Sequence, residues 1–258
     1  MRSFDFLVSE AVDADVSGWG WGWLEGRAHE ERPPWGFAKQ LSARLRRVDS
    51  ALDIDTGGGE VISRAPSLPS TMVVTEGWWP NAQHAQHLLA PRGVHVLHNL
   101  LGEPLPLADR VFELVTSRHP VAPDWHEIYR VLQPGGSYFA QHVGPASAFE
   151  LIEHFLGPLP AQRQARDARA EISAARSAGL QLTQVQTASC RMEFYDVGAV
   201  VWILRRCVWW VPDFTVDRYA AELAELDAGM REGRPFIAYS RRHLLDLIRP
   251  VSEQVQQR

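Results

Sequence analysis

Acidic residues and three glycines stand together in residues 51–60, a combination suited to holding a charged, nucleotide-like cofactor. Asp53 and Asp55 come first, in a short run that predicts a strand, and residues 57–59 are all glycine. Glycine lets a backbone approach a ligand closely and adopt conformations closed to other residues. Doubly wound α/β proteins bind cofactors where a strand runs into such a loop. The spacing matches neither the phosphate-cradling loop of nucleotide hydrolases nor the dinucleotide fingerprint, so it favours a cofactor with adenosine but no pyrophosphate.

A second carboxylate stands where such a fold binds a ribose. Residues 72–75 form an apolar, β-branched run that predicts a strand, and Glu76 ends it, 23 residues after Asp53. In doubly wound folds an acid at the end of the second strand hydrogen-bonds the ribose. The spacing therefore predicts that Glu76 binds a ribose.

Two histidines are the candidates for acid–base catalysis. His119 follows the run 112–117, and His142 lies near the end of the run 137–143; both runs predict strands. Ligands bind at the carboxyl ends of strands in open α/β sheets, so either imidazole could act as a general base. Each could equally line a pocket or make a structural hydrogen bond.

The elements that must position these residues alternate between strand and helix. Strands are expected at 51–55, 72–76, 93–97, 112–117, 137–143, 180–187 and 243–248, and helices at 35–48, 81–90, from 124, and at 168–178, 197–206 and 216–230. Asp124, with Glu127 three residues on, has the pattern of a capping box. This alternation predicts an α/β fold with a doubly wound, mostly parallel, seven-stranded sheet and helices on both faces.

Two further segments are expected around this sheet. Residues 35–258 should form the main domain, with 196–232 inserted as a small helical lid before the last strand. Residues 1–34, rich in tryptophan and glycine, are expected to be irregular and to cover the site.

Composition narrows the class of protein. The 258 residues, 45% of them hydrophobic, suffice for one large domain with a buried core. A formal net charge of −5 gives no support to bulk nucleic-acid binding. Cys190 and Cys207 lack metal-ligand spacing, so a reducing cytosol and no metal are expected. No apolar run approaches the roughly 18 residues of a membrane span, and the acidic first residues argue against a signal peptide, so we expect a cytoplasmic protein.

Four segments in a fixed order carry a family resemblance. They are the loop at 53–59, the acid Glu76, residues 105–115 (Leu-Pro-Leu-Ala-Asp-Arg-Val-Phe-Glu-Leu-Val) and residues 130–136 (Arg-Val-Leu-Gln-Pro-Gly-Gly). In this order the chain resembles the class I S-adenosylmethionine-dependent methyltransferases. Residues 56–60, 75–81, 117–119 and 194–199 are similar to a little-characterised bacterial branch of that family. The resemblance implies a Rossmann-like sheet and S-adenosylmethionine as cofactor, with S-adenosylhomocysteine as product.

The resemblance also implies a role for each residue of the cofactor site. Asp53 and the glycine loop would contact the methionine and ribose portion, and Glu76 would take both ribose hydroxyls. Asn99 falls where the family often has an aspartate that binds the adenine amino group, and its amide oxygen can accept in the same way. The full cofactor set implied is Asp53, Asp55, Gly57, Gly58, Gly59, Glu76, Gly77, Trp78, Asn99, Leu100 and Ser117.

One residue departs from the family pattern. Asp55 occupies the position of the first glycine of the loop. Its side chain could crowd the methionine moiety and repel its carboxylate, or it could pair with the ammonium or sulfonium of the ligand.

The acceptor side is expected to involve aromatic and polar residues. The set is Arg118, Gln141, Trp19, Trp35 and Trp202. The tryptophans could stack on an aromatic or cationic acceptor, or simply cover apolar surface, and the arginine could bind an anion or form a surface ion pair. Ten tryptophans favour a flat or apolar small molecule as substrate.

The sequence thus predicts an S-adenosylmethionine-dependent methyltransferase that acts on oxygen or nitrogen of a small molecule. An RNA methyltransferase is one alternative, which the acidic balance and the lack of a cysteine cluster disfavour. A non-catalytic cofactor-binding protein on the same fold is the other, prompted by Asp55. A nicotinamide dehydrogenase is disfavoured by the loop spacing. A tryptophan-rich lid could serve a homodimer as readily as a pocket.

Overall fold

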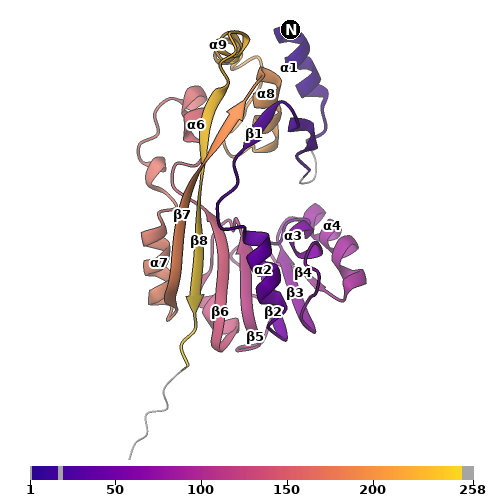
Figure 1. The fold of residues 1–258 in the computed structure, drawn as a ribbon, viewed down its shortest axis with the longest axis vertical. Helices are drawn as coiled ribbons and strands as arrows, with labels where there is room; N and C mark the ends of the chain where they lie inside the picture. Colours follow the sequence, from indigo (N-terminus) through magenta and orange to yellow (C-terminus); the bar gives the residue numbers. More distant parts are fainter. Residues whose placement is uncertain (1, 17–19, 252–258) are drawn as a thin grey trace, which may run out of the picture. The chain divides into compact units, whose positions relative to one another are not determined.

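The computed structural model describes residues 2–16 and 20–251 and divides the chain into two compact units (Figure 1). The first, here called the helical unit, consists of Met1–Arg32, Pro145–Ala165 and Ser189–Arg241. The second, the sheet unit, consists of Pro33–Gly144, Arg166–Ala188 and Arg242–Arg258. Each unit is therefore built from three separate stretches of sequence.

The elements fall into three groups. The sheet unit has α2 (Phe37–Leu45), α3 (Glu60–Ser63), α4 (Trp79–Leu89), η2 (Ala90–Arg92), α5 (Trp125–Val131), α7 (Ala168–Ser177), β2 (Ser50–Ile54), β3 (Thr71–Glu76), β4 (His95–His98), β5 (Phe112–Arg118) and β6 (Leu132–Val143). The helical unit has α1 (Phe4–Asp13), η1 (Gly22–Leu24), β1 (Ala28–Glu30), α6 (Phe149–Leu156), η3 (Gln162–Gln164), α8 (Val197–Arg206) and α9 (Ala220–Arg231). The long strands β7 (Gln181–Phe194) and β8 (Phe236–Ile248) contribute residues to both units.

The sheet unit has the doubly wound topology that the sequence predicts. Its strand order is β7-β8-β6-β5-β2-β3-β4. Neighbours from β6 to β4 run parallel, and β8 pairs antiparallel with β6. The sheet has eight strands where seven were expected, because β1 adds a short antiparallel pairing with the part of β7 in the helical unit. The predicted mostly parallel α/β sheet is confirmed.

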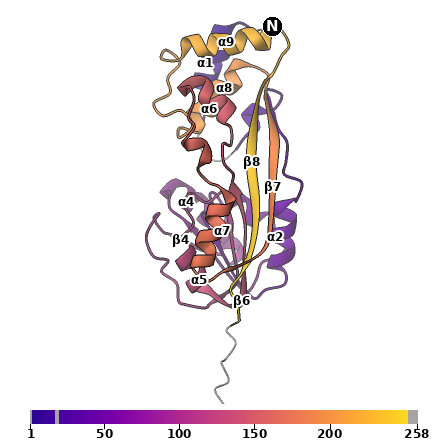
Figure 2. The same ribbon diagram turned by 90° about the vertical axis from the view of Figure 1, so that its left-hand side faces the viewer.

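Helices cover both faces of the sheet unit, and alternate residues of each strand face opposite sides. Ala51 and Leu114 pack in a cluster with α2, α3 and α4, whereas Leu52 and Val115 pack in a cluster with α5 and α7. Figure 2 shows α2 and α7 on opposite sides of the strands. Side chains on successive strand residues point to opposite faces, so strands covered on both faces are apolar almost throughout.

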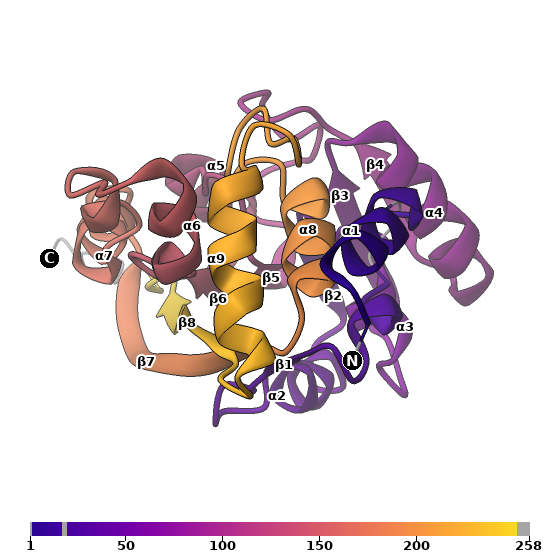
Figure 3. The ribbon, with the colours of Figure 1, turned by 90° about the horizontal axis from the view of Figure 1, so that it is seen from above.

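The helical unit is organised around α8, whose residues 197–204 are all buried. Helix α8 packs between α1 and α9 (Figure 3). The expectation that residues 1–34 are irregular is wrong for α1. The Ser3 side chain accepts from the Phe6 N–H and caps that helix, and Leu7, Val8 and Ala11 form its buried stripe. Helix α6 was not expected either, although Leu151, Ile152 and Phe155 give it a buried side.

No helix among the residues that the structure describes has the length and apolar character needed to span a bilayer. Of the predicted substrate residues, Trp19 lies outside the described residues.

Candidate cofactor and acceptor site

The loop after β2 adopts backbone conformations that require glycine. Gly57 and Gly59 have φ of 65° and 85°, in the left-handed region that other residues rarely enter. A Cβ on Gly59 would lie 2.7 Å from Cδ1 of Leu89, a fully buried residue of α4. The loop therefore combines tight backbone turns with close packing against α4, and both features exclude larger side chains.

The Glu76 carboxylate links this loop to the end of β3. Its Oε2 accepts from the Gly57 N–H at 2.8 Å, and its Oε1 accepts from the Trp78 N–H, also at 2.8 Å. The two amides fix the carboxylate in one orientation and leave each oxygen a second lone pair. Such a carboxylate can accept two further hydrogen bonds from a vicinal diol such as a ribose.

Apolar side chains flank this carboxylate and are exposed. Trp78 is 55% exposed and Leu100 is 48% exposed, although both are large apolar residues. A Cβ on Gly77 would lie 3.1 Å from the Asn99 carbonyl oxygen and 3.8 Å from the Leu100 Cα, so the loops after β3 and β4 meet here. Asn99 donates from Nδ2 to the carbonyl oxygens of Leu100 and Glu103, which leaves its Oδ1 as an acceptor. These features suit a flat heterocycle beside the ribose position.

Asp53 brings a nearly buried acid to the end of β2. Its carboxylate accepts from the Thr116 hydroxyl. Burial raises the pKa of Asp53 to about 6, and the nearby charge of Asp55 adds to the effect, while hydrogen bonds and Arg118 oppose it. A cationic ligand would favour the ionised form, so this end of the sheet suits a positively charged group.

Asp55 has a left-handed backbone conformation, with φ of 56°. Aspartate is among the few residues other than glycine that tolerate this region, so the loop can carry a side chain at this position. Its Oδ2 accepts from the Val121 N–H at 3.3 Å, and burial raises its pKa. Asp55 therefore joins the loop after β2 to the loop after β5.

The end of β5 lies next to the end of β2, because Ser117 is in register with Ile54. The Ser117 hydroxyl donates to the Ile54 carbonyl oxygen at 2.8 Å, so this side chain fixes the spacing of the two strands. The next residue, Arg118, has an exposed side chain. Of these two predicted residues, Arg118 is the one that presents its side chain at the surface.

A hydrogen-bond chain fixes the orientation of His119. The Trp35 Nε1–H donates to Gln141 Oε1 at 2.8 Å, and Gln141 Nε2 lies 2.9 Å from His119 Nε2. An indole can only donate, so the Gln141 amide group must donate to His119 Nε2. Burial and the charges of Arg242 and Arg118 hold the pKa of His119 well below its usual value. The ring is therefore neutral, with an engaged Nε2 and the proton on Nδ1.

His142 has a different environment from that of His119. Its Nε2 lies 2.9 Å from the Tyr138 hydroxyl, and its Nδ1 lies 2.7 Å from Glu171 Oε2. The residue is only 2% exposed, and burial lowers its pKa. Both ring nitrogens are therefore engaged inside the sheet unit, and the geometry does not favour His142 as a base for a substrate.

Glu171 and His243 were not identified from the sequence as site residues. Glu171 Oε2 also lies 2.7 Å from His243 Nε2. Burial alone would raise the pKa of Glu171, but the hydrogen bonds from the two histidines outweigh it and hold that pKa at about 2. His142, Glu171 and His243 form a cluster, and they come from β6, α7 and β8 respectively. No local spacing in the sequence could therefore have revealed it.

The residues that the sequence predicts to bind the methyl acceptor are divided between the two units. Trp35 and Gln141 belong to the hydrogen-bond chain just described, and both are buried in the sheet unit. Trp202 is 1% exposed in the core of the helical unit, where its ring stacks on Trp23 at a centroid distance of 5.7 Å. Its Nε1–H donates to the Asp15 carbonyl oxygen. Trp202 is therefore a core residue of that unit.

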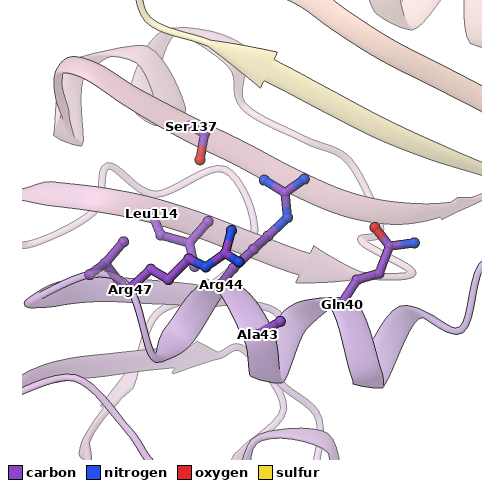
Figure 4. Close-up of a pocket in the computed structure, with 7 residues that line it drawn as sticks. Gln40, Ala43, Arg44, Arg47, Leu114 and Ser137 are labelled. Atoms are coloured by element: carbon purple, nitrogen blue, oxygen red, sulfur yellow. The ribbon is translucent and has the colours of Figure 1, made fainter.

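A surface hollow of about 400 Å³ lies on the α2 face of the sheet unit (Figure 4). Gln40, Arg44, Arg47, Leu114 and Ser137 are among its lining residues. None of them belongs to the cofactor set, and Arg44 forms an ion pair with Asp246. The hollow is therefore distinct from the glycine loop and its neighbours.

No protein-family model matches this chain, and no curated protein matches it either. Solved structures do. A proposed methyltransferase from Bacillus halodurans is 17% identical, with a TM-score of 0.59 over 83% of this chain and 97% of the other. The cyclase SpnF is 17% identical, with a TM-score of 0.54 over 95% of this chain and 93% of the other. A structure from Haloferax volcanii, of the Trm112 methyltransferase activator with a proposed methyltransferase, is 17% identical at a TM-score of 0.51, with 96% of each chain covered.

At these identities the likeness concerns the fold. The chain has the Rossmann-like fold of the class I S-adenosylmethionine-dependent methyltransferases, as the sequence motifs predicted.

Proposed function

We propose that this protein is an S-adenosylmethionine-dependent methyltransferase that acts on oxygen or nitrogen of a small-molecule acceptor. The observation that carries the proposal is the Glu76 carboxylate, which the Gly57 and Trp78 amides orient beside two exposed apolar side chains. This arrangement fits a ribose and an adjoining adenine. The fold supports the cofactor but does not set the reaction, since the similar protein SpnF is a cyclase.

The residues of the sheet unit match the chemistry of the cofactor. Glu76 would accept from the two ribose hydroxyls, and Asn99 Oδ1 would accept from the adenine amino group, with Trp78 and Leu100 against the ring. Asp53 and Asp55 would favour the positive charges of the ligand. When bound, S-adenosylmethionine supplies an electrophilic methyl group on a positively charged sulfur.

His119 would orient the acceptor. Its Nε2 is engaged by Gln141, so its Nδ1–H can donate a hydrogen bond to an acceptor oxygen or nitrogen. Its lowered pKa keeps the ring neutral at pH 7, so it adds no positive charge beside a cationic cofactor. In this proposal the chain supplies alignment, which is the main demand of an in-line methyl transfer. The proton that the acceptor loses would pass to water and not to a histidine, because His119 Nε2 and both nitrogens of His142 are already engaged.

A cofactor-binding protein without catalytic activity is the second candidate, and Asp55 favours it. Its carboxylate stands where the related family has a glycine, beside a second buried acid. If this charge prevents productive binding of the methionine carboxylate, the protein would bind the cofactor weakly and transfer no methyl group.

Isothermal titration of the purified chain with S-adenosylmethionine and S-adenosylhomocysteine tests the proposal. We expect one site per chain, and Glu76→Gln should weaken binding by about a hundredfold because it removes charge-assisted hydrogen bonds. Asp109→Asn is the matched control, because it also neutralises one carboxylate of the sheet unit but at an exposed position. Equal affinity in Glu76→Gln and the parent would refute the ribose assignment.

An acceptor screen then separates the two candidates. The assay follows formation of S-adenosylhomocysteine in the presence of pooled small alcohols, phenols and amines. Turnover that depends on an added acceptor supports the enzyme, whereas weak cofactor binding with no turnover across the pools supports the binding protein.

A further inference from the structure

Two histidines and one glutamate meet inside the sheet unit, outside the proposed cofactor set. Glu171 Oε2 lies 2.7 Å from both His142 Nδ1 and His243 Nε2. His243 is fully buried, and the Glu171 side chain is 17% exposed. One ligand atom from each residue can be chosen so that all three lie within 4.8 Å of one another.

We propose that His142, Glu171 and His243 bind a divalent transition-metal ion, for which Zn²⁺ is the appropriate probe. Two imidazole nitrogens and one carboxylate oxygen are a donor set that zinc uses where it keeps a fourth position for water or another ligand. The same donors disfavour Mg²⁺ and Ca²⁺, which prefer oxygen ligands. This proposal departs from the expectation of no metal, which rested on cysteine spacing alone.

The distances define the adjustment that an ion requires. Bonds of 2.0–2.1 Å place two ligands of a tetrahedral ion about 3.3 Å apart. The carboxylate oxygen now lies 2.7 Å from each nitrogen, so it would have to withdraw by about 0.6 Å, which rotation of the glutamate side chain on α7 can supply. The three ligand atoms lie within 4.8 Å of one another, and the two imidazole nitrogens would also have to reach about 3.3 Å from each other when the ion binds.

Surrounding residues hold the His142 ring in the orientation that a ligand needs. Its second nitrogen, Nε2, lies 2.9 Å from the hydroxyl of buried Tyr138. The ring also stacks on Trp125, at a centroid distance of 6.0 Å and an interplanar angle of 23°. A metal-bound histidine normally donates its other N–H to such a partner, which fixes the tautomer. Tyr138 can accept that hydrogen bond once Nδ1 binds the ion.

His243 offers its Nε2 to the cluster from a fully buried position on β8. Its other nitrogen, Nδ1, is buried and has no hydrogen-bond partner among the described residues, so the partner that fixes the tautomer of a metal-bound histidine is present for His142 but not for His243. The partly exposed edge of Glu171 gives an ion access to the cluster.

Metal analysis of the full chain tests the proposal without any cofactor. The protein is treated with a chelator, dialysed, and titrated with ZnCl₂ by calorimetry, and its metal content is measured after gel filtration. We expect one zinc per chain and a rise in melting temperature on zinc addition, because the ion binds only the folded cluster. Co²⁺ should give visible absorption bands typical of a four- or five-coordinate site, and Mg²⁺ should not compete.

Conservative variants locate the site. Glu171→Gln and His243→Asn should each weaken zinc binding by about a hundredfold or more, since each removes one of three ligands. His84→Ala is the control, because it removes a histidine from an exposed pair with Glu60. Circular dichroism checks that each variant is folded. No stoichiometric zinc in the parent, or zinc binding that is unchanged in folded Glu171→Gln and His243→Asn, would overturn the proposal.

Discussion

Asp53 shows how burial of a single acid couples stability to pH. Its pKa is about 6 in the folded chain, against 3.8 for a free side chain. The folded state therefore keeps this proton to higher pH than the unfolded state does. Its contribution lowers the free energy of unfolding progressively between about pH 4 and pH 6, by up to about 3 kcal/mol, and the loss persists above that window.

We predict that Asp53→Asn is more stable than the parent above pH 6 and that the difference disappears near pH 4. An amide oxygen can still accept from the Thr116 hydroxyl, so the variant removes the charge without removing the acceptor. Thermal unfolding of both proteins in matched buffers between pH 4 and pH 8 measures the effect. A difference in melting temperature that does not change with pH would contradict the assigned pKa.

Two substitutions at Asp55 separate its charge from its backbone conformation. Asp55→Asn tolerates φ of 56° and keeps an acceptor for the Val121 N–H, whereas Asp55→Gly removes the side chain altogether. If the carboxylate faces the sulfonium, Asp55→Asn should weaken S-adenosylmethionine by about tenfold and leave the uncharged thioether of S-adenosylhomocysteine less affected. Unchanged dissociation constants for both ligands in both variants would mean that Asp55 serves only the backbone.

At the residue scale, local motifs could predict the cofactor edge but not the hydrogen-bonded clusters. Glu76 and the glycines lie within 20 residues of one another, and the strand order places them together. Their pattern can therefore be recognised from the sequence alone. The indole of Trp35 meets Gln141 across 106 residues, and Glu171 meets His243 across 72. These pairings depend on which face of a strand each side chain occupies, which a histidine or glutamine does not reveal by its type.

At the element scale, the sequence predicts the residue that caps the N-terminus of α5 but not the role of the glutamate that follows it. Asp124 accepts from the His126 and Glu127 N–H groups and caps the helix as expected. Glu127 does not complete a capping box: its carboxylate accepts from the Leu105 N–H and from Arg130. Glu127, which a capping box would place against the backbone at the N-terminus of α5, therefore joins α5 to the preceding loop.

We predict that Asp124→Ala lowers the free energy of unfolding by about 1 kcal/mol, since two helix N–H groups lose their acceptor. Asp124→Asn should recover most of this loss, because asparagine is a comparable cap. Chemical denaturation of the three proteins measures the differences. A loss in Asp124→Ala that Asp124→Asn shares in full would show that charge, and not capping, is the origin.

The predictability of other elements follows from their periodicity. Helix α8 was placed at its observed bounds, because an apolar run after Asp196 ends in basic residues. Strand β7 was predicted only to residue 187, yet it continues to Phe194. Its extension pairs with β1, a three-residue strand whose sequence, Ala-His-Glu, carries no strand pattern. Long-range pairing, and not local preference, sets that end.

At the scale of the whole molecule, two strands belong to both cores. Residues 189–194 of β7 and 236–241 of β8 lie in the helical unit, and the remainder of each strand lies in the sheet unit. Loss of pairing in one part of a strand removes the ordered neighbour of the ladder in the next part. The two units are therefore expected to unfold together.

We predict that Leu204→Ala in the helical unit and Leu245→Ala in the sheet unit each cost about 2–5 kcal/mol, because both side chains are fully buried. Each variant should still give a single calorimetric transition at a lower temperature. Two resolved transitions in either variant, with only one of them shifted, would show that the units unfold independently.

The helical unit is built from segments that lie far apart in the sequence, and this has a consequence during protein synthesis. The Arg205 side chain of α8 donates to the Ala11 carbonyl oxygen of α1, across 194 residues. At a translation rate of about 5–20 residues per second, α1 leaves the ribosome about 10–40 s before α8 does. Throughout that interval the apolar stripe of Leu7, Val8 and Ala11 lacks the helix that later buries it. The nascent chain therefore exposes these apolar side chains to water for about 10–40 s before α8 can bury them.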